Sequence, residues 1–351
     1  MHFISSFEQG GAEKLLLYFA KACSEDITVV IMSNLVDENL KQELLKTGHK
    51  AYFLDKKKGQ KHPRYLFRLW KVIKDNNIDI IHAHDFGSMM WPILCKILKP
   101  KLKLIYTIHS SPDVKNWNKI TLLINRYFID MNIAISEDIL NDCVKNKLKA
   151  KKIYNGIDIK SWKLSQGDTR IFRIINVARI THQIKGQDIL IKALKDCKDK
   201  GIKFVCDLVG EVNDVKSCKY LKTLTKDSDL SDEINFLENR EDVPDLLAQS
   251  DLFILPSRIE GLPLSLLEAM ASRLPVIASN ISGSAELVEH GKNGLLFESE
   301  NHSDLAEKIL FLYNNREEMK RLAENAVESA QRFDISVMVE NYWGLYKNLI
   351  K

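Results

Sequence analysis

The sequence has no apolar run long enough to cross a lipid bilayer. Its most apolar stretches, such as ITVVIM at 27–32, are about six residues long, whereas a membrane-spanning helix needs about 20. The first residues, MHFISSFEQGG, show no basic region followed by an apolar one, which argues against a secretory signal peptide. Six cysteines are present, but none forms a Cys-x-x-Cys pair. They are typical of reduced thiols in a cytosolic protein rather than of disulfides or a zinc site.

Two nucleotide-binding motifs are also missing. The chain contains neither G-x-G-x-x-G nor G-x-x-x-x-G-K-[ST], so classical dinucleotide and P-loop binding are disfavoured. A metal site is not expected either. Asp227-Ser228-Asp229 has the spacing of some divalent-ion sites, but the surrounding run LTKDSDLSDEI is typical of a solvated helix end. His82 and His84, two apart on one expected strand, would need a third ligand to hold zinc.

The residues that are present fit two globular domains of ordinary size. The chain has 351 residues, against about 100–200 per domain, and 45% of them are hydrophobic.

The net charge of +4 is unevenly distributed. Residues 1–165 hold 27 Lys+Arg against 17 Asp+Glu, a net of +10, and residues 166–351 hold 24 against 30, a net of −6. A basic first half suggests an anionic surface or substrate there, and a solvated basic face without a partner is the alternative.

Short apolar segments alternate with helical-period stretches along nearly the whole chain. Near-continuous apolar strands predict sheets covered on both faces, and alternation with helices makes those sheets parallel. Each half is therefore expected to be a Rossmann-like, doubly wound α/β domain, with a boundary near 158–170. The last two helical stretches, 302–331 and 335–350, have no expected strand between them. The expected strands are 2–5, 27–32, 51–54, 78–83, 103–109, 132–135, 151–155, 172–178, 204–210, 234–237, 251–256 and 274–279.

The loops that follow strands are where functional residues are expected, because open parallel sheets bind ligands at the carboxyl ends of their strands. Two facing domains would place these loops across one central cleft. After the first strand, Gly10 and Gly11 permit a close backbone approach to a ligand, and an ordinary strand–helix turn is the alternative. His109 ends a later strand and is a candidate polar group in the cleft, or simply a hydrogen-bonded loop histidine.

In the second half, the loop after the strand at 172–178 carries Arg179 and Lys185. Two cations beside a helix start can clamp a diphosphate without a metal ion, although exposed loop cations are common.

The most informative segment is 256–271, PSRIEGLPLSLLEAMA. Its helix, which begins near Pro263, is apolar on nearly every side, and this is typical of a buried helix. Glu268 in the middle would then be a buried carboxylate, which is costly unless it is paired. Its carboxylate is placed to accept hydrogen bonds from two hydroxyls of a ribose. Glu260, in the preceding loop, could accept hydrogen bonds from the hydroxyls of a sugar ring. The alternative is that Glu268 pairs with a cation or caps a loop.

Taken together, the motifs resemble those of glycosyltransferase family 4, retaining enzymes of GT-B type that use nucleotide-sugar donors. The pair Glu260/Glu268 within EGLPLSLLEAMA is the most specific of them. The matching segments follow the family's order over nearly the whole chain: GGAE (10–13), DIIHAHD (79–85), T-x-H (107–109), YNGID (154–158), VARITHQIKGQDILIKAL (177–194), REDVPDLLAQSDLFILPSRIEGLPLSLLEAMA (240–271), PVIAS (275–279) and ELVEHGKNGLLF (286–297).

The resemblance implies a domain organisation and a role for each matched residue. Residues 1–160, joined by a helix at about 335–351, would form an acceptor-side domain, and residues 165–334 would hold the donor. Two residues, His109 and Glu260, are implied to be catalytic, with His109 on the sugar side. The implied donor-binding residues are Arg179 and Lys185 on the diphosphate with the amides of Leu264 and Ser265, Glu268 on the ribose, the backbone of Gly261, Leu262 and Pro263 on the sugar, and Gly11 near the phosphate.

The resemblance also implies a reaction that needs neither metal nor cofactor. A sugar would pass with retention from a nucleotide-diphosphate donor, a UDP-sugar being favoured over a GDP-sugar, to a glycan or lipid-linked acceptor in bacterial cell-surface polysaccharide synthesis. No nucleic-acid partner is expected. A nucleotide-sugar epimerase of similar fold and a catalytically inactive GT-B binding or scaffold subunit are the alternatives.

Two departures from the family pattern accompany the match. The first strand begins at His2, a few residues earlier than usual, which suggests a clipped N-terminus. Where the family commonly has a glycine near the base, this chain has Glu238-Asn239.

A basic amphipathic stretch at 56–74, centred on Trp70, suggests a cytoplasmic protein that binds anionic membranes peripherally. The alternative is that the apolar residues of this stretch belong to the core.

Overall fold

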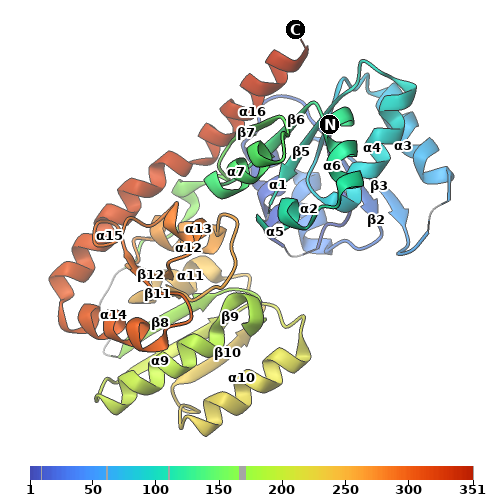
Figure 1. Ribbon diagram of the computed structural model, residues 1–351. Helices are drawn as coiled ribbons and strands as arrows, with labels where there is room; N and C mark the ends of the chain where they lie inside the picture. The colour runs from blue at the N-terminus through green and yellow to red at the C-terminus, as the bar shows by residue number, and fades with distance from the viewer. Residues whose placement is uncertain (9, 61, 110, 166–170, 351) are drawn as a thin grey trace. The chain divides into compact units, whose positions relative to one another are not determined.

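The computed structural model describes residues 1–8, 10–60, 62–109, 111–165 and 171–350. These residues divide into two compact units (Figure 1). One unit consists of Met1–Asp158 together with Phe333–Lys351, and the other of Ile159–Arg332. The sequence predicts a first domain of 1–160 joined by 335–351 and a second of 165–334, so the observed boundaries lie within a few residues of the expected ones.

The first unit contains a seven-stranded parallel sheet with the strand order β3-β2-β1-β4-β5-β6-β7. Each expected strand of this half is present. The strands are β1 (His2–Ile4), β2 (Thr28–Ser33), β3 (Lys50–Lys56), β4 (Ile80–Ala83), β5 (Lys103–Ile108), β6 (Met131–Ala134) and β7 (Ala150–Lys152). The helices are α1 (Gly11–Ala22), α2 (Glu38–Lys46), α3 (Arg64–Asp75), α4 (Phe86–Leu98), α5 (Ser111–Asn116), α6 (Lys119–Phe128), α7 (Glu137–Lys145) and α16 (Ile335–Ile350).

Helix α16 returns the end of the chain to the first unit. It packs against α1, and the hydroxyl of Tyr346 lies 2.7 Å from Nδ1 of His82 on β4. The indole N–H of Trp343 also donates to the sulfur of Cys23, at 3.3 Å. The final helix is therefore part of the core of the first unit.

The second unit contains a six-stranded parallel sheet with the order β10-β9-β8-β11-β12-β13. The strands are β8 (Phe172–Val177), β9 (Phe204–Val209), β10 (Ile234–Glu238), β11 (Leu252–Leu255), β12 (Val276–Ser279) and β13 (Leu295–Phe297). The helices are α8 (His182–Lys185), α9 (Gln187–Asp199), α10 (Val215–Asp227), α11 (Val243–Ala248), α12 (Leu264–Ala271), α13 (Ser282–Ala285), α14 (His302–Asn314) and α15 (Arg316–Ala330), with the short 3-10 helices η1 (Ile159–Ser161) and η2 (Gln331–Phe333).

Two details of the second unit differ from the sequence prediction. Strand β13 was not expected from the sequence. The helical stretch expected at 302–331 is divided at Asn315 into α14 and α15. The prediction of two Rossmann-like parallel-sheet domains is confirmed.

Each sheet reverses its strand order at one place, between β1 and β4 in the first unit and between β8 and β11 in the second. In open parallel sheets this switch point, at the carboxyl ends of the strands, is where ligands bind. The topology thus directs attention to the loops that follow β1, β8 and β11. Among the described residues, no helix is both long enough and apolar enough to span a membrane.

Candidate active site

The loops after β8 and β11 are in close backbone contact within the second unit. Gly186, which ends α8, has φ +65°, and a Cβ there would lie 1.9 Å from the carbonyl oxygen of Pro256. Gly210, after β9, would bring a Cβ within 2.0 Å of the carbonyl oxygen of Ala178. Glycine is therefore required at both positions, because any side chain would push these loops apart.

This close approach brings Lys185 and Glu260 together. The Lys185 ammonium donates to Oε1 of Glu260 at 2.6 Å, and the buried hydroxyl of Ser257 donates to the same oxygen at 2.7 Å. The two charged side chains are only 17% and 10% exposed. An ammonium has three N–H donors, so Lys185 can hold Glu260 and still bind an anion.

Arg258 fixes the short helix that carries Lys185. Its guanidinium forms two hydrogen bonds with Asp188, at 2.8 and 3.0 Å, and also donates to Glu300 and to the carbonyl of His182. Its backbone N–H donates to the carbonyl of Ile184. Although burial opposes charge on Asp188, the hydrogen bonds and charge of Arg258 hold the pKa of that carboxyl below its usual value.

Helix α12 is buried, as its composition predicts. Glu268 is 7% exposed in the middle of this helix. Pro263 occupies the N-cap position and no side chain caps the helix start, so the first backbone N–H groups, including those of Leu264 and Ser265, have no partner within the helix. Such a helix start attracts anions.

The remaining donor-side residues surround the same loops. Arg179 is exposed, and its carbonyl accepts a hydrogen bond from the buried side chain of Gln187 at 2.8 Å. Leu262 is buried and Gly261 is half-buried. A Cβ on Gly283, in α13, would lie 2.6 Å from the carbonyl oxygen of Gly261, so α13 packs closely against this loop. The expected residues of the second unit thus lie between β8 and α9, in the loop after β11 and in the first five residues of α12.

Gly11 and His109 belong to the first unit, which is described separately. Gly11 begins α1, is exposed, and has nothing within 4 Å of the position a Cβ would take. His109 follows β5 and is half-buried, but its Nε2 is buried and has no hydrogen-bond partner among the described residues. Burial lowers the pKa of His109 to about 4, so its imidazole is neutral at physiological pH.

Three residues of the site were not assigned a role from the sequence. Ser257 and Arg258 lie inside the quoted segment 256–271, and Gly186 follows Lys185 directly. Ser257 and Arg258 could have been noticed as polar residues directly after a strand. However, the partners of Arg258 lie 42 to 76 residues away in the sequence, so its contacts could not be predicted from local spacing.

Comparison with known proteins identifies the family. A model of Glycosyl transferases group 1 matches residues 160–329, and a model of Glycosyltransferase Family 4 matches residues 9–161. An uncharacterized glycosyltransferase of Methanocaldococcus jannaschii is 34% identical over 302 residues, 81% of each chain. The chain belongs to glycosyltransferase family 4.

Two further relatives extend the comparison of this glycosyltransferase. The N,N'-diacetylbacillosaminyl-diphospho-undecaprenol alpha-1,3-N-acetylgalactosaminyltransferase of Campylobacter jejuni is 32% identical over 190 residues, 54% of this chain and 48% of that protein. The crystal structure of Anabaena Alr3699/HepE in complex with UDP and glucose superposes with a TM-score of 0.87 at 24% identity, covering 99% of both chains. The latter likeness confirms the GT-B fold.

Glu238 is the residue at which the family resemblance predicts a glycine. It has φ +50°, in the left-handed region that favours glycine, and its carbonyl accepts a hydrogen bond from the N–H of Gly210 at 2.7 Å. The backbone at Glu238 therefore has a conformation that glycine adopts readily.

The histidines of the first unit form a buried cluster, and the third member is His2, which sequence spacing did not suggest. Among the described residues, His2, His82 and His84 are the one group of ligating side chains close enough to hold a metal ion. However, His82 bonds Tyr346 and Thr107 with its two nitrogens, and His2 shares a hydrogen bond with His84 at 2.8 Å. Burial lowers the pKa of all three imidazoles well below 6.5. The arrangement fits a neutral hydrogen-bonded core.

The basic stretch at 56–74 contains α3. Its residues Tyr65, Leu69 and Ile73 are at most 1% exposed, so they pack in the core rather than facing a membrane. The core interpretation of this apolar face is the one the structure supports. Trp70 is half-buried, and Phe67 is 69% exposed.

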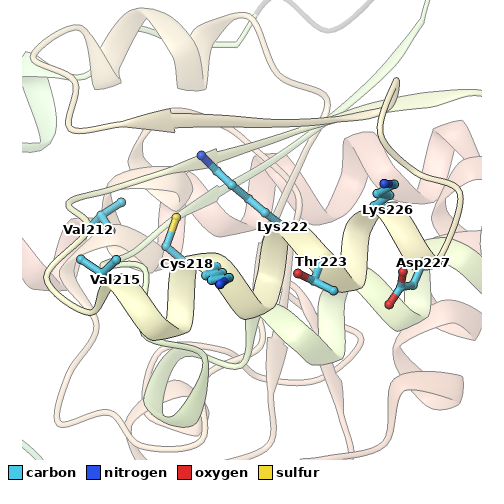
Figure 2. Close-up of a pocket in the computed structure, with 8 residues that line it drawn as sticks. Val212, Val215, Cys218, Lys222, Thr223, Lys226 and Asp227 are labelled. Atoms are coloured by element: carbon cyan, nitrogen blue, oxygen red, sulfur yellow. The ribbon is translucent and has the colours of Figure 1, made fainter.

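A surface groove of about 550 Å³ runs along α10 of the second unit (Figure 2). Its lining includes Lys219, Lys222 and Lys226, together with Val212 and Val215. No residue expected to bind the donor lines this groove, so it is separate from the candidate active site.

Proposed function

We propose that this glycosyltransferase transfers a hexosyl group, with retention of configuration, from a UDP-sugar to a glycan or lipid-linked acceptor. The observation that supports this best is the meeting of Lys185 and Glu260 beside the uncapped start of α12. A cation, a carboxylate and free N–H donors in one place suit a diphosphate next to a sugar. UDP and glucose in the complex of Alr3699/HepE favour this donor class.

Each candidate site residue of the second unit has a proposed role in binding the donor. Arg179, Lys185 and the amides of Leu264 and Ser265 bind the diphosphate. The carboxylate of Glu268, which is buried in α12, accepts hydrogen bonds from the ribose hydroxyls. Glu260, with the backbone of residues 261–263, holds the sugar. Gly11, at the start of α1 in the first unit, is proposed to lie near the phosphate.

The proposed reaction proceeds without a metal ion. The bond between the sugar and the diphosphate lengthens toward an oxocarbenium-like state, and the cations and helix N–H groups stabilise the charge on the departing phosphate. The acceptor hydroxyl attacks on the face that the diphosphate leaves and gives its proton to that phosphate. His109, being neutral, contributes a hydrogen bond on the sugar side rather than a positive charge.

The acceptor and the cellular location are proposed from the named activity of a relative. The diphospho-undecaprenol named for the C. jejuni relative favours a lipid-linked acceptor in polysaccharide synthesis. We therefore propose a cytoplasmic protein that works at the membrane surface without spanning it.

The decisive experiment measures nucleoside diphosphate release from UDP-, GDP- and ADP-sugars with a chelator present. We expect release from a UDP-sugar to persist in the chelator and to rise when a suitable acceptor is added. Lys185→Met and Glu268→Gln should weaken UDP binding at least ten-fold, while Lys216→Met, on the exposed side of α10, should not. A requirement for Mg²⁺ or Mn²⁺ would refute the metal-free reaction. Conversion of the donor sugar without acceptor would instead indicate an epimerase.

A further inference from the structure

Helix α10 of the second unit presents a row of lysines to solvent. Lys219, Lys222 and Lys226 follow Val215 at intervals of four, three and four residues, so all four side chains lie on one face of the helix. All four are exposed, Val215 to 74%. We call the three lysines the α10 lysine row.

The row borders the surface groove along α10. Every residue that lines this groove lies on α10 or in the loop directly before it. Figure 2 shows Val212, Val215 and Cys218 together at one end of the groove, Lys226 at the other end and Lys222 between them. The groove therefore offers apolar contact at one end and positive charge along the rest of its length.

The lysine row has no counterion within the part of the chain that the structure describes. The acidic residues just after α10 are already engaged, because Lys198 pairs with Asp229 at 3.3 Å and with Glu233 at 2.9 Å. Asp214, at the start of the helix, accepts hydrogen bonds from two backbone N–H groups of α10. The positive charge of the row is therefore available to a partner.

The length of the row selects the kind of anion that fits it. From Lys219 to Lys226 the helix rises about 10 Å, at 1.5 Å per residue. A single phosphate group is much shorter than this and cannot contact the whole row. Glutamates at intervals of three and four on a second helix repeat with the same rise, so each of them can meet one lysine.

A nucleic acid fits this surface less well than a short acidic helix does. Residues 166–351, which include α10, carry a net charge of −6. Asp227 also lines the groove, next to Lys226. Both features repel a long, continuous phosphate backbone more than a segment with three carboxylates.

We propose that the groove along α10 binds an acidic amphipathic helix of a partner protein. The carboxylates of that helix pair with the α10 lysine row, and its apolar side chains cover Val212, Val215 and Cys218. No residue that is proposed to hold the donor lines the groove, so this interaction is separate from sugar transfer.

The test is fluorescence anisotropy of a labelled, alanine-based helical peptide titrated with the whole chain. The peptide carries three glutamates at intervals of three and four residues, with two leucines on the same face. We expect saturable binding that weakens about ten-fold or more when the salt concentration is raised to about 0.5 M. A peptide with glutamines in place of the glutamates, and one with the glutamates distributed around the helix, should each bind at least about five-fold more weakly.

Removal of the lysine row should weaken binding of the glutamate peptide about ten-fold, because three exposed charge pairs are lost together. The variant that removes the row is Lys219→Gln/Lys222→Gln/Lys226→Gln. The matched control makes the same change in net charge at three exposed lysines of the first unit and should leave binding unchanged. It is Lys145→Gln/Lys149→Gln/Lys151→Gln.

The apolar end of the groove is tested separately. Val215→Ser should weaken binding about five-fold, because the valine side chain leaves water when the peptide binds. Val144→Ser changes a 65% exposed valine of the first unit and should have no effect.

UDP release should be the same in all of these variants, so failure of this proposal is distinguishable from failure of the proposed transferase activity. Absence of binding by the glutamate peptide, equal binding by the peptide with distributed glutamates, or equal loss in the two lysine variants would overturn the proposal. So would tighter binding of a single-stranded oligonucleotide through the same lysines, or self-association of the chain alone that the loss of the row abolishes.

Discussion

Gly186→Ala should damage the candidate active site through the backbone alone. The new Cβ would stand 1.9 Å from the carbonyl oxygen of Pro256, while ordinary contact needs more than 3 Å. The φ of +65° adds about 1–2 kcal/mol for an L-residue, and overpacking adds about 1–3 kcal/mol, less about 0.5 kcal/mol from the stiffer unfolded chain. We expect a loss of about 2–4 kcal/mol in the free energy of unfolding of the second unit.

The chain supplies a control with the same backbone strain and no clash. Gly201, after α9, has φ +85° with nothing within 4 Å of a Cβ. Gly201→Ala should therefore cost only about 1 kcal/mol. The difference between the two variants measures the close approach of the loops after β8 and β11.

The functional readout is the affinity for UDP, measured by calorimetry below the unfolding transition of either variant. Moving Gly186 away from Pro256 separates Lys185 from Ser257 and Glu260, so Gly186→Ala should weaken UDP binding about ten-fold or more. Gly201→Ala should bind UDP as the unaltered chain does. Equal stability of the two variants, or unaltered UDP affinity in Gly186→Ala, would refute the reasoning.

Three further predictions follow from the contacts described above. Arg258→Met leaves the Asp188 carboxylate, whose side chain is 9% exposed, without its cationic partner, and should lower the free energy of unfolding of the second unit in denaturant by about 2–3 kcal/mol. Arg240→Met breaks the exposed pair with Asp242 and should change this free energy little. Equal effects of the two variants would contradict the role given to Arg258. Lowering the pH from 8 to 5 should destabilise the first unit, because the unfolded chain takes up a proton on His109 below pH 6.5 while the folded pKa is about 4. His109 accounts for about 2 kcal/mol of this loss by pH 5. His109→Asn should therefore reduce the pH dependence followed by tryptophan fluorescence by that amount, and His2, His82 and His84, whose pKa values are also lowered by burial, should keep the rest. Tyr346→Phe removes the hydroxyl that His82 contacts and should cost about 1–3 kcal/mol in the same assay, whereas a stability within error of the unaltered chain would show that this contact is dispensable.

The architecture was largely predictable because its signals are local. Alternating apolar strands and amphipathic helices extend over most of the chain, and twelve of the thirteen strands coincide with expected segments. The thirteenth, Leu295–Phe297, was not among the expected segments. The helix containing Glu268 was recognisable as buried from its composition alone.

The contacts within the site were not predictable, because they join residues far apart in the chain. Lys185 and Glu260 lie 75 residues apart in the sequence and were assigned to different parts of the donor. In the structure their side chains are hydrogen-bonded to each other. Likewise, His2 on β1 completes the histidine cluster with His82 on β4 and His84 directly after it. Spacing arguments reach along one strand or one helix, whereas the order of strands in the sheet decides which loops meet.

The return of α16 to the first unit sets the order in which a chain leaving the ribosome can fold. The second unit, Ile159–Arg332, is complete once its last residue has emerged. The first unit has been made earlier but lacks Tyr342 and Tyr346, two of its buried aromatic side chains, until the last turns of α16 are synthesised. Domains generally fold in the order of synthesis. Here the first unit is incomplete until α16 has been made, so the apolar surface that α16 covers stays exposed while the second half is being synthesised.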